Sequence, residues 1–143
     1  MTNIKKRHIF IVLFIYLFCC ASTTTLEAQD SPEYDVNTEI SLSGTIAQVS
    51  SEMRGPQLFT LQSEGKIYTV LTGPKWYLSD IGLILKSGMR VEVIGSKMYA
   101  SDGRLHIITF SILNVEAQKR YQFRRNDMTP LWMGQRRGRG PHR

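Results

Sequence analysis

Residues 66–94, KIYTVLTGPKWYLSDIGLILKSGMRVEVI, contain the change of pattern that decides the fold. Residues 67–71 are rich in β-branched and aromatic side chains and predict a strand. The Gly73-Pro74 pair then breaks the sheet, and apolar side chains at spacings of three and four over residues 75–86 predict a short helix or helical turn. The end of the stretch begins another strand. The sequence therefore predicts strand, short helix and strand in succession.

The segments on either side predict further strands and complete the pattern of a small barrel. The predicted strands cover residues 39–50, 57–62, 67–71, 89–99 and 105–113, with a further short one over 119–125. Gly44 interrupts the first strand, as a bulge or bend does. Three strands, a short helix and two strands is the element order of the OB-fold, a five-stranded Greek-key barrel. We therefore predict an all-β, OB-like barrel, with a small sandwich or another open barrel as the alternative.

The first 28 residues have the order of regions found in a secretory signal peptide. A positive cluster, Lys5 to Arg7, precedes an uncharged run over residues 9–21, and small or polar residues lead to a cut after Ala28. We expect cleavage there and a periplasmic or secreted protein. One alternative is membrane anchoring through residues 9–25, because an uncleaved run stays in the bilayer. Another is a lipoprotein modified at Cys20, which the residues before that cysteine disfavour.

The remaining sequence divides by charge into a body and a tail. We expect residues 29–38 to be a flexible lead-in, residues 39–134 the barrel, and residues 135–143 a disordered basic tail. Residues 29–116 hold seven basic and ten acidic side chains, whereas residues 117–143 hold eight basic and one acidic. The basic pI of the chain therefore comes from its ends, and a nucleic-acid groove needs positive charge on the domain itself.

Three segments carry a resemblance to a known family. They are GPKWYL at residues 73–78, KSGMRVEVIGS at 86–96 and PLWMG at 130–134. In these motifs the chain, over about residues 39–134, resembles small exported bacterial proteins with the magnetosome MamS/MamX-type domain. The resemblance implies an OB-like exported domain. Haem-binding relatives carry a CxxCH motif that this sequence lacks, so a haem role does not transfer, and a magnetosome role does not follow from a domain match alone.

Two sets of side chains are candidates for binding. The aromatics Trp76, Tyr77 and Trp132 suit a stacking surface for bases or sugars, although we favour the interpretation that they close a barrel end as core residues. The tail arginines suit anionic lipid headgroups, polyanions or an acidic partner, and a plain solvated tail is an equal alternative. These arginines are Arg136, Arg137, Arg139 and Arg143.

The barrel segment offers few groups for catalysis. Its only histidine is His106, without a second ligand at metal-binding spacing, and no phosphate loop or nucleophile motif is present. We expect no enzyme activity, no metal and no cofactor. The predicted function is an exported, non-catalytic binding or accessory module of the cell envelope, whose partner is an envelope protein or an anionic ligand, with membrane-surface contact through the tail. The alternative is an exported oligonucleotide- or polyanion-binding OB-fold protein.

Overall fold

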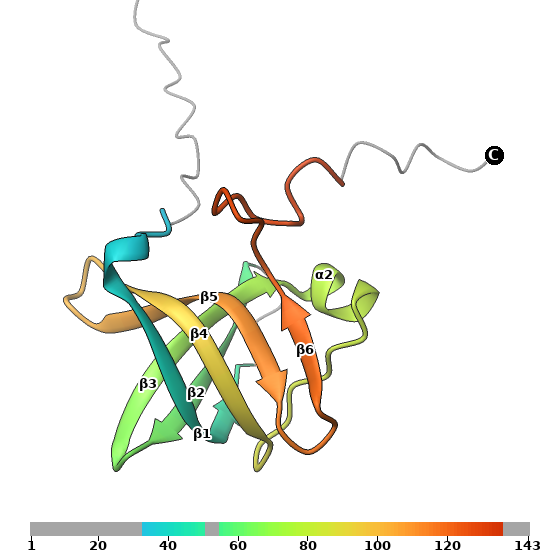
Figure 1. The fold of residues 1–143 in the computed structure, drawn as a ribbon. Helices are drawn as coiled ribbons and strands as arrows, with labels where there is room; N and C mark the ends of the chain where they lie inside the picture. The colour runs from blue at the N-terminus through green and yellow to red at the C-terminus, as the bar shows by residue number, and fades with distance from the viewer. Residues whose placement is uncertain (1–32, 51–54, 136–143) are drawn as a thin grey trace, which may run out of the picture. The chain divides into compact units, whose positions relative to one another are not determined.

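A computed structural model of the chain describes residues 33–50 and 55–135, which form six strands, one α-helix and one 3-10 helix (Figure 1). In chain order they are η1 (Val36–Thr38), β1 (Glu39–Val49), β2 (Pro56–Ser63), β3 (Lys66–Pro74), α2 (Lys75–Asp80), β4 (Arg90–Tyr99), β5 (Leu105–Asn114) and β6 (Lys119–Gln122). None of the helices in these residues is long and apolar enough to cross a bilayer.

Five of the strands close into a barrel. The sheet order is β3-β2-β1-β4-β5-β6, and a parallel pairing of β3 with β5 joins the sheet to itself. The first half of β1 pairs with β4 and its second half pairs with β2, both antiparallel. With α2 between β3 and β4, this confirms the predicted five-stranded OB-like barrel. The short strand β6 adds to the free part of β5.

The barrel interior is filled by the apolar side chains that alternate along the strands. The largest that are fully buried come from five strands and from the segment after β6, and they are Ile46, Phe59, Leu61, Val70, Val91, Val93, Ile107, Ile112 and Phe123. Burying a side chain of this size contributes roughly 1.5–3 kcal/mol relative to leaving it in water. The alternate positions on the same strands point outward and form the surface available for binding.

β1 crosses from one partner strand to the other at Gly44. A Cβ atom at this position would overlap the backbone carbonyl oxygen of Gln62, so only glycine allows β1 and β2 to approach this closely. The bulge lies further along, where the register shifts between Ile46 and Gln48. The interruption predicted at Gly44 is therefore a close strand crossing, and the irregular pairing follows it.

The boundary between β3 and α2 differs from the prediction. β3 does not break at Gly73-Pro74 but runs through Pro74, which lies opposite Pro56 at the end of the β2–β3 ladder, where a missing N–H breaks no interior pair. α2 follows directly and ends at Asp80 instead of extending to residue 86. The Leu83 N–H donates to the Leu78 carbonyl at 2.9 Å, the long bond of a Schellman motif that ends the helix.

Candidate functional site

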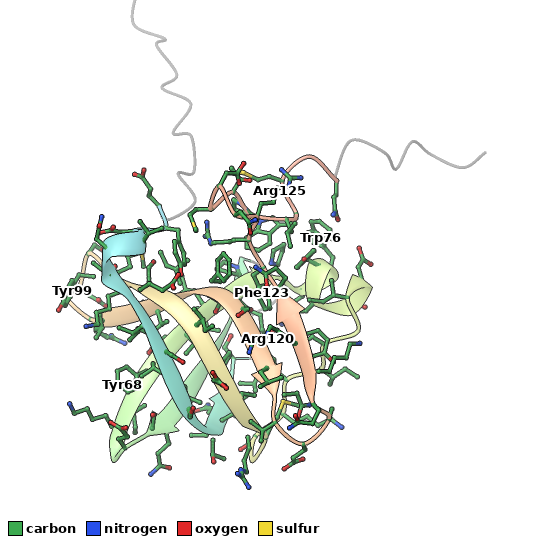
Figure 2. All side chains as sticks on the ribbon, viewed as in Figure 1. Tyr68, Trp76, Tyr99, Arg120, Phe123 and Arg125 are labelled. Carbon is green, nitrogen blue, oxygen red and sulfur yellow. The ribbon has the colours of Figure 1, made fainter. Side chains whose placement is uncertain are left out.

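The three predicted aromatic residues lie together at the helix end of the barrel. α2 begins after Pro74, whose extended backbone turns the chain from β3 into the helix. This places Tyr77 against the barrel, 4% exposed, with its ring centroid 5.5 Å from that of Trp132 and 6.1 Å from that of Trp76. Phe123 lies beneath it at 6.0 Å and is fully buried (Figure 2). We call these four side chains the aromatic end cluster.

Backbone contacts hold the aromatic end cluster in place. The Tyr77 hydroxyl donates to the Gln122 carbonyl at 2.9 Å and so joins α2 to β6. A Cβ atom on Gly73 would lie 2.9 Å from Cζ3 of Trp132, so the glycine of the first sequence motif makes room for the tryptophan of the last. Burial raises the pKa of Tyr77. The motifs GPKWYL and PLWMG thus pack against each other.

This packing determines what the cluster offers to a ligand. Tyr77 has almost no exposed surface, and Trp76 and Trp132 are half-buried because each packs against the core. A base or sugar therefore meets only parts of the two tryptophan rings, and the arrangement favours closure of the barrel end over a stacking platform. The other predicted binding residues, the tail arginines Arg136, Arg137, Arg139 and Arg143, lie outside the described residues.

Tyr34 anchors the residues that precede β1. Its side chain is 7% exposed, its ring centroid lies 6.0 Å from that of Phe110, and its hydroxyl donates to Oε2 of Glu39 at 2.5 Å. The carboxylate of Asp35 accepts the backbone N–H of Asn37 and begins η1. These contacts correct the prediction of a flexible lead-in over residues 33–38, because a ring buried against β5 fixes the backbone around it. The rest of the predicted lead-in lies outside the described residues.

Arg124, which follows β6 in the sequence, also contacts Tyr34. Its guanidinium carbon lies 5.2 Å from the ring centroid of Tyr34, and Nη1 donates to the Met128 carbonyl at 2.8 Å. The side chain is 5% exposed, and its Nε has no hydrogen-bond partner within residues 33–50 and 55–135. Burial lowers the pKa of Arg124, whereas burial and then the hydrogen bond and charge of Glu39 raise the pKa of Tyr34. We call Tyr34, Glu39 and Arg124 the N-terminal clasp.

The clasp gives a pH-dependent stability prediction. Tyr34→Phe removes the hydroxyl bonded to Glu39, so the free energy of unfolding at neutral pH should fall by about 1 kcal/mol. Above pH 10 the unfolded tyrosine ionises while the folded one stays protonated, because its folded pKa is raised from 10.0. The stability that Tyr34 confers is therefore complete below pH 10 and falls above it. The difference in the free energy of unfolding between wild type and Tyr34→Phe should narrow as the pH rises above 10.

Urea unfolding at neutral pH and above pH 10 measures both values. Tyr99→Phe is the matched control, since Tyr99 is 72% exposed and should show no change at neutral pH. A gap that is absent at neutral pH, or that widens as the pH rises, contradicts the role assigned to Tyr34.

Another surface was not singled out by the sequence, because it contains neither aromatic nor charged clusters. Phe59, Leu61 and Val70 are buried inside the barrel, so the residues that alternate with them point outward. On the outside, Thr60 lies opposite Thr69 and Gln62 lies opposite Ile67. Ile67 is 71% exposed, the highest value among large apolar side chains of β2 and β3. We call these four outward residues the β2–β3 face.

The β2–β3 face has no formal charge on its own side chains. β2 holds no charged residue, and β3 holds only Lys66, at its first position. The face extends from β3 to β5 through the parallel pairing of the two strands, in which the register partner of Thr69 is His106. His106 therefore belongs to the edge of this face, and residues 33–50 and 55–135 contain no group of three metal-ligating side chains around it or elsewhere. The chemistry that this face offers is hydrogen bonding by uncharged groups beside an exposed apolar side chain.

Comparisons with known proteins found a family model that matches the chain and solved structures that are similar to it. The model of a family described as the MamS/MamX magnetosome protein family matches residues 38–117, from the start of β1 to just beyond β5. The match ends before β6, so Trp132 and Arg124 lie outside it, and it is shorter than the resemblance predicted over residues 39–134. No curated protein matches the chain.

Two crystal structures of the mitochondrial single-stranded DNA binding protein Rim1 from S. cerevisiae are also similar in fold. One is 14% identical with a TM-score of 0.44 and covers 58% of this chain and 94% of its own. The other is 13% identical with a TM-score of 0.39 and covers 56% and 93%.

Proposed function

Since this chain belongs to the MamS/MamX magnetosome protein family, we propose that it acts as an exported, non-catalytic binding or accessory module of the cell envelope. The observation that carries the proposal is the β2–β3 face, on which, within the described residues, Gln62 and Ile67 are exposed and Thr60 and Thr69 are half-buried, on a barrel whose interior and helix end are filled by packed side chains. A barrel that is complete without a ligand inside it, and that leaves the outside of its second and third strands open, is suited to binding on that side.

Export is inferred from the N-terminal sequence, and this part of the proposal has a direct test. Residues 1–32 lie outside the described part, so the signal peptide remains a prediction from the positive cluster, the uncharged run and Ala28. Intact-mass measurement of the protein from the envelope fraction should give a chain that begins at Gln29. A mass that includes the first 28 residues moves the protein to the anchored class, and an added diacylglycerol on Cys20 makes it a lipoprotein.

Binding is tested by amide chemical shifts in the protein purified after export from full-length expression. We expect a ligand of the envelope to shift the amides of Thr60 and Thr69 and to leave those of Tyr77 and Trp132 unchanged. The probes are a neutral oligosaccharide, a single-stranded oligonucleotide and vesicles that contain anionic lipid. Shifts confined to the aromatic end cluster, or no shift in the barrel with any probe, contradict the proposal.

The alternative function, binding of oligonucleotides or polyanions, is distinguished by its dependence on salt and on the tail. Phosphate contacts made by cations release counterions, so such binding weakens steeply with salt. Because β2 and β3 carry one cation between them, we expect oligonucleotide binding to be weak and to disappear when residues 135–143 are deleted. Binding that survives the deletion unchanged, and that shifts the amides of the β2–β3 face, favours the alternative.

A further inference from the structure

We propose that the β2–β3 face binds a neutral glycan chain, along a row of uncharged polar side chains that crosses the barrel from β1 to β5. The row consists of Gln48, Thr60, Thr69 and His106. This inference rests on the proposed binding function and names the class of ligand. It follows from the strand register, from the hydrogen-bonding capacity of these side chains, and from the charge of the surface around them.

The register places the four side chains in neighbouring positions on four strands. Gln48 pairs with Thr60 across β1 and β2, and Thr60 pairs with Thr69 across β2 and β3. Thr69 then pairs with His106 across the parallel contact that closes the barrel. Neighbouring strands lie about 4.8 Å apart, so the row extends over about 14 Å. That length accommodates a few consecutive sugar residues of an extended chain.

The chemistry of the row matches sugar hydroxyl groups. A sugar hydroxyl both donates and accepts hydrogen bonds, and it meets its match in side chains that do the same. The amide of Gln48 and the hydroxyl groups of Thr60 and Thr69 each combine donor and acceptor capacity. The Thr60 hydroxyl lies 3.5 Å from the Gln48 carbonyl, at the limit of a hydrogen bond, so it can turn to a ligand at little cost.

An exposed apolar side chain flanks the row. Ile67 is the outward residue of β3 two positions before Thr69 and is 71% exposed. The C–H faces of sugar rings are apolar and pack on such side chains.

Charge decides between the two polymers that OB-fold barrels bind on this side, oligonucleotides and oligosaccharides. A single-stranded nucleic acid needs cations along its backbone and aromatic side chains beneath its bases. The row contains no lysine, arginine, aspartate or glutamate, and its strands β2 and β3 contribute only Lys66 at the outer end. A neutral polymer complements this surface, whereas a polyanion finds no counter-charge along it.

Calorimetric titration with two neutral probes tests the inference. The probes are the hexasaccharides of β-1,4-linked glucose and β-1,4-linked N-acetylglucosamine, added to the protein purified after export. At least one should bind with an affinity that is the same at low and high salt. The double variant Thr60→Val and Thr69→Val keeps the β-branched shape and removes both hydroxyl groups, so affinity should fall at least about tenfold. Ser41→Ala, an exposed β1 residue outside the row, is the matched control and should bind as wild type does.

The outcomes separate this inference from the proposed function. Unchanged binding in the double variant overturns the glycan inference and leaves the proposed binding function in place. The same holds if neither hexasaccharide binds while an oligonucleotide or a vesicle shifts the amides of the β2–β3 face. If no probe shifts that face, both fail. Circular dichroism and the unfolding midpoint of the double variant should equal those of wild type, because both threonines are on the outside of the barrel.

Discussion

Replacing Phe123 by alanine should lower the free energy of unfolding by about 4 kcal/mol, which is typical of a large buried aromatic side chain. The side chain is fully buried and its ring meets that of Tyr77 at 6.0 Å. Truncation removes its transfer free energy and leaves a cavity beneath the helix, which can collapse only in part because the surrounding strands belong to a closed barrel. The variant should therefore lose the attachment of α2 before it loses the sheet.

Urea unfolding followed by tryptophan fluorescence measures the loss of stability. The chain has two tryptophans, Trp76 and Trp132, and both lie in the aromatic end cluster. Phe123→Leu retains most of the apolar volume and should lose less than half as much stability. A loss below about 1 kcal/mol for the alanine variant is incompatible with a core position, given the usual cost of such truncations.

Replacing Gly44 by alanine should be the other severe change, with a loss of about 3 kcal/mol or more. The added methyl group would overlap the carbonyl oxygen of Gln62, a backbone atom held in the β1–β2 ladder, so no flexible side chain can move aside. β1 must then separate from β2 just where it leaves β4. The barrel opens at this seam, while the pairing of β4 with β5 persists.

Hydrogen exchange locates that damage. In the Gly44→Ala variant, protection should fall first at the amides that pair β1 with β2, from Thr45 to Val49, and later elsewhere. Ser41→Ala lies on the same strand opposite Ile94 and should leave both protection and stability near wild type. An unaltered unfolding midpoint for Gly44→Ala contradicts the close crossing of the two strands.

Local patterns explain why the barrel could be predicted from the sequence. The alternation of Phe59 and Leu61 with Thr60 and Gln62, and the turn residues between strands, predict the strand positions to within a few residues. The boundary at Pro74 was wrong because a proline predicts a break by its missing N–H, and that rule does not apply at the last pair of a ladder. The bulge after Ile46 left no signal, since its neighbours are ordinary strand residues.

Long-range contacts explain what the sequence could not predict about the site. The three aromatics were identified, but whether they stack on a ligand or pack on one another depends on how Gly73 meets Trp132. Tyr34 lay in a segment too polar to suggest burial, and its burial depends on Arg124. The β2–β3 face carried a weak sequence signal, the absence of charge in residues 56–63, which becomes informative only when the register aligns it with Thr69.

The N-terminal clasp also affects the order in which contacts can form during synthesis of the chain. Tyr34 is among the first domain residues to leave the ribosome and Arg124 among the last, yet the tyrosine is buried in part by the arginine. Trp132 imposes the same delay on Gly73. The Tyr34–Arg124 and Gly73–Trp132 contacts therefore form only after the five barrel strands have been made, because each contact needs a residue that follows β5.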